Sequence, residues 1–372
     1  MGSELPDRLQ CLADFADRAQ KTMSAATWDF VSGGSGTERS LAANRNAFDN
    51  LFLIPRMLRD VSQISTATRL AGTSASLPVA IAPMAYHSLV HPEGELATAR
   101  AAKVAGVPFT VAMLSGTPIE QISESGADLW FQLYWLRDRG ATAELLRRAE
   151  AAGCRAIVLT VDVPRLGRRL RDHRNGFALP GNVYAAHFRG DAAVGAQRSS
   201  TGGSAVATHT TEMFDPALDW SDVEWLRQRT ELPIVVKGIL AREDAAMAVR
   251  SGADAIVLSN HGGRQLDGAV PGITVLPEVR AAVGDDVELL VDGSVRTGTD
   301  VLKALASGAD GVLLGRPILH GLAVSGEAGV GAVLALLREE FETDLALSGC
   351  RTIRDAARLR ITSSTAAGHS PY

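Results

Sequence analysis

The segment "AVRSGADAIVLSNHGG", residues 248–263, decides the fold because its pattern recurs along the chain. A helical stretch ends at a glycine, and a short aliphatic run follows it and stops at a polar group. The same unit is found in three further segments, the last of them weaker: "RAEAAGCRAIVLTVD" (148–162), "ALASGADGVLLGRP" (304–317) and "ARAAKVAGVPFTVAM" (99–113). The glycines that end the helical stretches stand where a positive φ is favoured: 106, 153, 252 and 308. Short runs that are apolar on both faces are typical of parallel strands covered by helices.

Strands and helices alternate through most of the chain. The strands are predicted at 77–82, 107–112, 129–134, 156–161, 233–237, 255–259, 287–292 and 311–314. The helices are predicted near 93–105, 118–124, 139–152, 221–230, 241–251, 275–283, 298–307 and 317–347. Eight strand–helix units over about 270 residues match a (β/α)8 TIM barrel, an α/β fold, which we place at 76–348. A doubly wound open sheet is the alternative, but its glycine-rich nucleotide fingerprint is missing after the first strand.

Three segments fall outside this pattern within what we expect to be a single domain, 1–372. Residues 1–75 are predicted to form an N-terminal helical extension, with helices around 9–20 and 24–32. Residues 349–372 are expected to form a C-terminal tail. Residues 181–215 are rich in Gly, Ala, Ser and Thr and have no sustained period. Since this long loop follows the fourth strand, we predict a mobile lid over the mouth of the barrel.

The composition excludes several classes of protein. The 372 residues are 46% hydrophobic and 21% charged, with a net charge of -5 and no Lys/Arg-rich block, which argues against nucleic-acid binding. Cys11, Cys154 and Cys350 form no metal-ligand spacing and no disulfide framework, so no metal site and a reducing compartment are expected. The first residues lack a signal-peptide core, and no apolar run reaches the length of about 18 residues that a membrane span needs. We therefore expect a soluble cytoplasmic protein without a membrane partner.

Polar groups stand at the ends of the predicted strands, although the strand interiors hold almost none. In a (β/α)8 barrel the active site forms at these carboxyl ends. The loops after strands seven and eight, which commonly bind phosphate in this fold, read "DGSVRTGTD" (292–300) and "GRP" (315–317). Gly293 and Gly315 would let backbone amides approach an anion, and Arg296 and Arg316 would add charge. Glycine turns with surface arginines are the alternative.

Three ionisable residues end other strands. Lys237 closes an apolar run, so it is expected to be buried and to face an anion or a reacting group; pairing with Asp162 or Asp292 is the alternative. His261 precedes two glycines and is a candidate base, which Asp162 could orient.

Arginines gather after the fourth strand, in "VPRLGRRLRD". One of Arg165, Arg168, Arg169 and Arg171 pointing inward would form a carboxylate clamp with Arg264. A base, a carboxylate clamp and a phosphate site together indicate a phosphorylated cofactor beside a small organic acid.

Several motifs resemble one family. They are "SNHGGRQLDG", "LTVDVPRLGRR", "FQLYW", "VVKG", "VDGSVRTGTDVLKALASGADGVLLGRP" and "IAPMAYHSLVHPEGELATARAA". Together they are similar to those of the FMN-dependent 2-hydroxy-acid oxidases and dehydrogenases, in order and from about residue 9 to 360. The resemblance implies FMN as cofactor, a 2-hydroxy acid and dioxygen as small-molecule partners, and a homo-oligomer, either a tetramer or an octamer.

The resemblance also implies roles for individual residues. His261 would be the base, Asp162 would support its imidazolium, and Lys237 would stabilise negative charge on the reduced flavin. Arg169 and Arg264 would hold the substrate carboxylate, and Tyr134 would hydrogen-bond at the reacting centre. Flavin contacts are implied for Ala82, Pro83, Met84, Gln132, Thr160 and Ser259. Phosphate contacts are implied for Asp292, Gly293, Arg296, Gly315 and Arg316.

The substrate pocket departs from that of glycolate and lactate oxidases. Phe30, in "TWDFVSGG", replaces a tyrosine that touches the substrate carboxylate, Leu114 replaces a tryptophan and Tyr86 a methionine. The lost hydrogen bond is worth about 1.5–3 kcal/mol to a charged partner. With Phe30 at this position, the sequence resembles the members of the family that oxidise 4-hydroxymandelate in actinomycete antibiotic pathways. We therefore expect an (S)-2-hydroxy acid with an aryl group, 4-hydroxymandelate or mandelate. The alternative is that Phe30 is packed core and the substrates are smaller.

An oxidase that makes hydrogen peroxide is favoured by elimination. Dehydrogenase relatives pass electrons to a membrane quinone or a cytochrome, but no haem domain and no apolar stretch in 181–215 is found. Two other classes stay open: another FMN-barrel reaction, such as isomerisation of a phosphorylated isoprenoid, and a flavin-binding protein without turnover. The first would not need Arg169 and Arg264, and the second would be expected to have lost His261 or Arg264.

Overall fold

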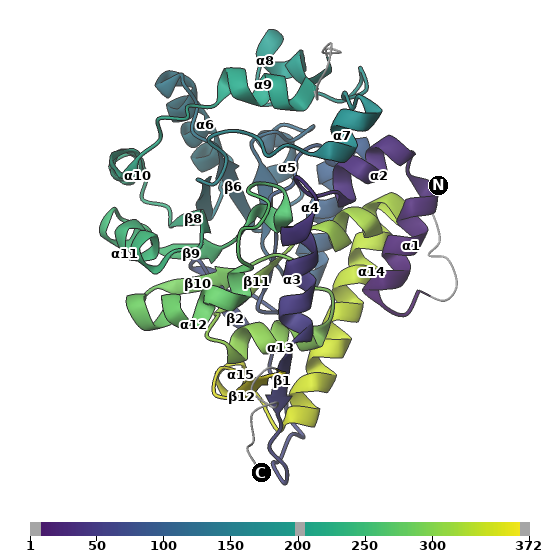
Figure 1. Ribbon diagram of the computed structural model, residues 1–372, viewed down its shortest axis with the longest axis vertical. Helices are drawn as coiled ribbons and strands as arrows, with labels where there is room; N and C mark the ends of the chain where they lie inside the picture. The colour runs from purple at the N-terminus through teal and green to yellow at the C-terminus, as the bar shows by residue number, and fades with distance from the viewer. Residues whose placement is uncertain (1–8, 198–204, 365–372) are drawn as a thin grey trace.

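The computed structural model describes residues 9–197 and 205–364, and its centre is a closed barrel of parallel strands (Figure 1). The strands follow one another around the barrel in the order β10-β11-β4-β5-β6-β7-β8-β9. Their bounds are β4 Val79–Ile81, β5 Phe109–Ala112, β6 Leu129–Leu133, β7 Ala156–Thr160, β8 Ile234–Ile239, β9 Ala255–Leu258, β10 Glu288–Val291 and β11 Gly311–Leu314. The predicted barrel and its eight strands are confirmed.

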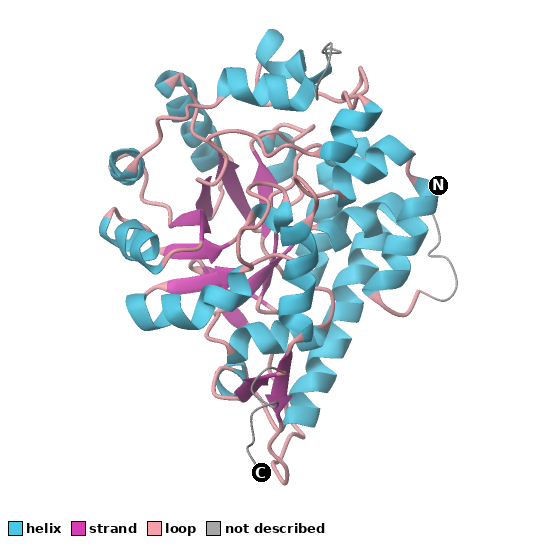
Figure 2. Cartoon of the chain, viewed as in Figure 1, coloured by secondary structure: helices cyan, strands magenta, loops and turns pink. Residues whose placement is uncertain are grey.

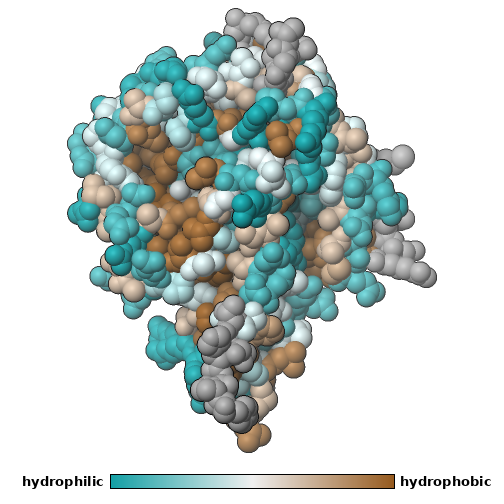
Figure 3. Space-filling view, viewed as in Figure 1, coloured by the Kyte–Doolittle hydropathy of each residue, from teal (hydrophilic) through white to brown (hydrophobic). Residues whose placement is uncertain are grey.

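Helices surround the barrel (Figure 2). They are α4 Gly94–Ala105, α5 Ile119–Ser123, α6 Arg139–Ala151, α10 Trp220–Arg227, α11 Arg242–Arg250, α12 Gly272–Val283, α13 Gly298–Ala306 and α14 Arg316–Ser348. The strands read as continuous apolar runs because the helices cover their outer faces and side chains fill the barrel. On the face seen in Figure 3, hydrophobic surface gathers toward the barrel, while the outward faces of the helices are mostly hydrophilic.

The amino end of the barrel is closed by a hairpin that the sequence did not indicate. Strands β2 (Thr68–Leu70) and β3 (Thr73–Ala75) are antiparallel. Leu70 belongs to the same buried cluster as Trp130 of β6, and the Trp130 indole N–H donates to Thr73 Oγ1 at 2.9 Å. The hairpin therefore plugs the barrel on the side opposite to the polar strand ends.

The described part of the N-terminal segment, residues 9–75, contains helices close to both predicted ranges, 9–20 and 24–32, but it is helical only in part. Its helices are α1 Leu12–Thr22, α2 Ala25–Ser32 and α3 Arg39–Asp49, and it also holds the strands β1 (Leu51–Ile54), β2 and β3. The predicted tail at 349–372 contains α15 (Ile353–Ala356) and β12 (Arg360–Ser363), and β12 pairs antiparallel with β1. A strand of the N-terminal segment therefore pairs with a strand near the C-terminal end of the described chain.

The segment 181–215 is not the structureless loop that its composition suggests. It contains α8 (Asp191–Val194), η2 (Gly195–Gln197) and α9 (Ala205–Met213), and it follows the short helix α7 (Leu170–Asn175). Residues 198–204 of the predicted loop lie outside the described part of the chain. Phe214, just after α9, forms an antiparallel bridge with Leu136, just after β6. This contact fixes one end of the segment to the barrel, and its mobility stays a prediction.

Helix α14 is long and apolar enough to meet the length and composition test for a membrane span, the one such helix in the described chain. Of its most apolar window, 67% is buried inside the protein, as for the core helix of a folded domain. Ser325 and Gly326 leave helical geometry, so the element consists of two helices joined at a kink.

Candidate active site

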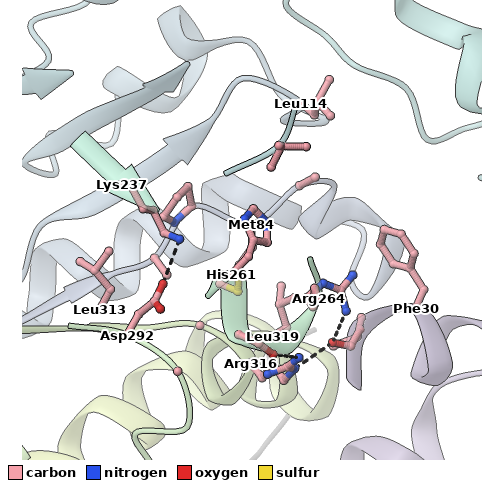
Figure 4. A pocket seen from close by; sticks show the side chains of 18 of the residues that line it. Phe30, Met84, Leu114, Lys237, His261, Arg264, Asp292, Leu313, Arg316 and Leu319 are labelled. Atoms are coloured by element: carbon pink, nitrogen blue, oxygen red, sulfur yellow. Dashed lines mark hydrogen bonds and ion pairs between the residues drawn. The ribbon is translucent and has the colours of Figure 1, made fainter. Parts of the chain in front are cut away.

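A pocket lies at the carboxyl ends of the barrel strands, and it holds about 1120 Å³ of empty space when its opening to solvent is included (Figure 4). The predicted site residues that line it are Phe30, Ala82, Pro83, Met84, Tyr86, Leu114, Tyr134, Arg169, Lys237, His261, Arg264, Asp292, Gly293, Arg296, Gly315 and Arg316. Four predicted residues do not line it: Gln132, Thr160, Asp162 and Ser259. Asp162 and Ser259 hydrogen-bond to residues that do. The barrel thus brings the predicted groups together from separate strand ends.

His261 follows β9 in a left-handed backbone conformation, with φ of 58°. Such a conformation costs energy for a residue with a side chain. The His261 N–H donates to Ser259 Oγ at 2.9 Å, and this hydrogen bond helps to hold the turn. The imidazole Nδ1 lies 3.0 Å from Asp162 Oδ1, so Nε2 is left to meet a ligand. Burial lowers the pKa of His261 more than Asp162 raises it. The imidazole is therefore neutral at neutral pH and can accept a proton.

Asp162 lies behind His261 with 13% of its side chain exposed, and it stays ionised. Burial alone would raise the pKa of Asp162, but His261 and Lys237 bring it below its ordinary value. A carboxylate in this place stabilises the imidazolium that forms when His261 takes a proton.

Lys237 is buried, with 4% of its surface exposed, and both of its partners are polar. Its Nζ lies 2.9 Å from Asp292 Oδ2 and donates to Ser259 Oγ at 2.9 Å. Burial lowers the pKa of Lys237, but Asp292 and Asp162 raise it by more, so the ammonium is retained. The alternative left open by the sequence, a lysine paired with a carboxylate, is therefore correct. It does not exclude a ligand, since Lys237 also lines the pocket (Figure 4).

Arg169 is buried and Arg264 is partly buried, and neither forms an ion pair with a carboxylate in the described residues. Burial lowers the pKa of Arg169, and burial with the charges of Arg169 and Arg316 lowers the pKa of Arg264 far below its usual value. The Arg264 guanidinium donates to the backbone oxygen of Gly33 at 2.7 Å, which only partly offsets this cost. Guanidinium groups this crowded are stabilised when an anion such as a carboxylate binds between them.

The other arginines after the fourth strand face away from the pocket. Arg165 and Arg168 are exposed, and Arg171 forms ion pairs with Glu38 and Asp29. Only Arg169 of this group fulfils the expected inward role.

Arg296 and Arg316 form the phosphate end of the pocket. Burial has the largest effect on both groups, and the positive charges of neighbouring arginines add to it. Together they lower the pKa of Arg296 to about 10 and that of Arg316 to about 9. Gly293 has φ of 89°, a conformation that favours glycine and brings the backbone close to the pocket. These groups fit a phosphate.

Asp292 does not fit the phosphate contact that the resemblance implies for it. Its carboxylate is anionic and pairs with Lys237, so it would repel a phosphate. Its second oxygen, Oδ1, is buried without a partner in the described residues, and this acceptor suits a hydroxyl group of a ligand instead.

FMN is the expected cofactor, and unpaired buried atoms test whether the site fits it. Gln132 Nε2 and Thr160 Oγ1 have no hydrogen-bond partner in the part of the chain that is described, as is true of Asp292 Oδ1. Buried polar atoms without partners are costly, so these three indicate a polar ligand at the strand ends. Together with the two phosphate-end arginines they supply what a flavin ring edge, a ribityl chain and a phosphate require. The residues present therefore fit FMN.

The substrate end of the pocket is aromatic. The Phe30 ring stacks on Phe177 with a centroid separation of 4.4 Å and an angle of 11°. The guanidinium carbons of Arg169 and Arg264 lie 5.9 Å and 5.5 Å from the centroid of the Phe30 ring. Tyr134 stacks on Phe214 at 4.5 Å. The carboxylate clamp therefore lies beside aromatic walls.

Some pocket residues were missed by sequence reasoning. Val206, Thr210 and Phe214, from α9 and its end, line the pocket, although 181–215 was predicted only as a lid. The carbonyl of Gly33 accepts hydrogen bonds from both Arg264 and Arg316. Phe214 could have been suspected as an aromatic residue in the segment 181–215, but a backbone carbonyl leaves no signal in the sequence.

Comparisons with known proteins identify a family. The family model described as FMN-dependent dehydrogenase matches residues 19–363. The chain is 55% identical to a 4-hydroxymandelate oxidase of Amycolatopsis orientalis over 94% of this chain and 97% of that protein. It is 46% identical to an L-lactate oxidase of Nostoc sp. over 92% of this chain and 95% of that protein.

A solved structure is similar throughout. The crystal structure of mandelate oxidase with (S)-4-hydroxymandelic acid superposes with a TM-score of 0.93 and 54% identity, covering 95% of this chain and 99% of that one. The solved structure supports the fold, and the family model supports the dependence on FMN.

Proposed function

The chain belongs to the FMN-dependent dehydrogenase family, and from this premise we propose that it oxidises an aryl 2-hydroxy acid, 4-hydroxymandelate or mandelate, to the 2-keto acid. The observation that carries the proposal is the position of Phe30. Its ring stacks on Phe177 and lies beside both guanidinium groups of the carboxylate clamp. An acid held by that clamp would place its own side chain against aromatic surface.

The proposed chemistry assigns a task to each polar residue. Arg169 and Arg264 bind the carboxylate and thereby orient the α-carbon. His261 takes a proton from the substrate at Nε2, and Asp162 stabilises the resulting imidazolium. FMN, when bound, accepts the two electrons that leave the substrate.

Two further groups support the reaction. Lys237 supplies positive charge on the cofactor side of the pocket, and Asp292 keeps that lysine protonated. Tyr134 makes no hydrogen bond within the described residues, and burial raises its pKa, so its phenol is available as a donor to the substrate.

The electron acceptor and the enantiomer are part of the proposal. Dioxygen would be reduced to hydrogen peroxide. The (S)-enantiomer is favoured because the similar crystal structure holds (S)-4-hydroxymandelic acid. A cytoplasmic location, a place in antibiotic biosynthesis and a homotetramer or homo-octamer are proposed on the family resemblance alone.

A small aliphatic acid is the second candidate, because an L-lactate oxidase is 46% identical. The experiment that separates the two measures oxygen consumption and peroxide release by the purified holoenzyme with four acids at equal concentration: (S)-mandelate, (S)-4-hydroxymandelate, L-lactate and glycolate. The proposal expects kcat/KM for the aryl acids to exceed that for the aliphatic acids. Higher kcat/KM for lactate or glycolate would reject the aryl assignment, and reduction of an added dye without peroxide would reject the oxidase assignment.

A further inference from the structure

Tyr86 is held in an unusual backbone conformation at the wall of the pocket. It has φ of 57°, and its side chain is buried, with 1% of the residue exposed. Of the six described non-glycine residues with positive φ, three line the pocket: Tyr86, His261 and Ser294. Strained residues persist where the surrounding structure over-determines them, and they gather at functional sites.

Backbone contacts on both sides fix this conformation. The Tyr86 N–H donates to the carbonyl of Leu114 at 3.2 Å, and the Tyr86 carbonyl accepts from Leu89 N–H at 2.9 Å. The next amide, of His87, donates to the buried Glu95 carboxylate at 3.0 Å. Tyr86 is therefore placed by the loops after β4 and β5 rather than by its own packing.

The hydroxyl group of Tyr86 is buried without a hydrogen-bond partner in the described residues. Burial, with a smaller effect of Tyr134, raises the pKa of Tyr86, so the phenol stays neutral and keeps its proton to donate. An unpaired buried hydroxyl is destabilising, and a partner can be supplied by what the pocket binds.

The surroundings offer no other partner. Leu114, whose carbonyl accepts from the Tyr86 amide, is apolar, and so are Val206 and Phe214, which α9 and its end contribute to the same pocket. Thr210 of the lid uses its hydroxyl on carbonyls of its own helix, those of Val206 and Ala207. Tyr134 has the family's expected task at the reacting centre. The Tyr86 hydroxyl is therefore left without a hydrogen-bond partner among the described residues.

We propose that the Tyr86 hydroxyl hydrogen-bonds to a hydroxyl on the aromatic ring of the substrate and so selects 4-hydroxymandelate over mandelate. This rests on the proposed function, that the substrate is an aryl 2-hydroxy acid. Tyr86 is then a specificity-determining residue for the ring substituent, separate from the arginines that bind the carboxylate.

The test compares the wild type and one variant, each with two acids. Purified wild-type holoenzyme and Tyr86→Phe are assayed for kcat and KM with (S)-4-hydroxymandelate and (S)-mandelate. Removing the partner of a buried substrate hydroxyl is expected to lower kcat/KM for 4-hydroxymandelate about tenfold while that for mandelate changes less than about twofold. The two keto acids, 4-hydroxybenzoylformate and benzoylformate, are titrated against flavin absorbance in the same proteins. In Tyr86→Phe the dissociation constant of 4-hydroxybenzoylformate is expected to rise relative to that of benzoylformate by a similar factor.

Two tyrosine variants serve as controls. Tyr184, which is exposed and outside the pocket, is changed to Phe and is expected to leave both acids unaffected. Tyr134→Phe is expected to lower kcat/KM for both acids by the same factor. Retained yellow colour and mandelate turnover show that Tyr86→Phe is folded.

Each outcome bears on one claim. An unchanged ratio between the two acids in Tyr86→Phe, or an equal loss for both, overturns the role of Tyr86 and leaves the proposed function intact. Failure of the wild type to oxidise either acid rejects the proposed function and this inference with it.

Discussion

The imidazole of His261 and the carboxylate of Asp162 meet at 3.0 Å although 99 residues separate them in the chain. They come from the ends of β9 and β7, with β8 between, and neither strand could place them alone. The closed barrel makes this pair, and the pair leaves Nε2 of a neutral imidazole available as a base.

Removal of the carboxylate tests this pair. In Asp162→Asn the imidazolium loses its partner, so kcat is expected to fall by about 10²–10⁴. Wild-type kcat/KM should fall as pH drops through the lowered pKa of His261, because only the neutral imidazole accepts a proton. Asp162 raises the pKa of His261, so its removal should shift the acid side of the pH–rate profile to lower pH. A shift to higher pH would contradict the pairing of Asp162 with a catalytic His261.

Phe30→Tyr is expected to shift preference toward aliphatic acids. The added phenol lies beside Arg169 and Arg264 and can donate to the substrate carboxylate, an interaction worth about 1.5–3 kcal/mol. KM for L-lactate and glycolate should fall about tenfold or more, while KM for mandelate should improve less because the stack on Phe177 is disturbed. Steady-state kinetics with the three acids measure the change. Equal improvement for all would show that Phe30 does not discriminate between side chains.

Arg169→Met separates binding from stability. The variant should raise KM for mandelate about 100-fold, since a buried charge pair with the carboxylate is lost. Without substrate it should unfold at the same or a higher temperature, because Arg169 is buried with Nε unpaired. Arg168→Met, at the exposed neighbouring position, is the matched control and should leave both quantities unchanged. A marked fall in the Tm of Arg169→Met would mean that the arginine is structural.

Lys237→Met should be destabilising, because it leaves the Asp292 carboxylate buried and unpaired. Breaking one side of such a pair costs about 3–5 kcal/mol of unfolding free energy. Adding Asp292→Asn to the variant should restore part of that loss, which denaturant unfolding of the single and double variants measures. No recovery in the double variant would show that the ion pair is not the source of the effect.

Much of the barrel could be predicted from the sequence because its signals are local. A glycine with positive φ followed by a short apolar run marks each repeat, and the helices and strands match their predicted ranges to within a few residues. The site followed from the barrel, since the carboxyl ends of parallel strands converge.

What was missed depends on contacts that leave no local signal. The strand β12 forms only because β1, which stands near the other end of the chain, offers it an edge. Helix α9 reads as "AVATHTTEM", a weak helix former that is fixed by burying Ala205 and Val206. The carbonyl of Gly33, which serves two arginines, is a backbone atom that any residue would supply.

The most direct test of the central claim is anaerobic reduction of the bound flavin by substrate. Wild-type holoenzyme and His261→Ala are mixed with (S)-mandelate and (S)-4-hydroxymandelate without oxygen, and absorbance of the oxidised flavin is followed. The wild type should bleach with at least one of the two acids, and His261→Ala should keep its yellow colour and bleach at least about 100-fold more slowly. A wild type that stays yellow with every 2-hydroxy acid, or a His261→Ala variant that bleaches at the wild-type rate, would contradict the claim that His261 is the base in this pocket.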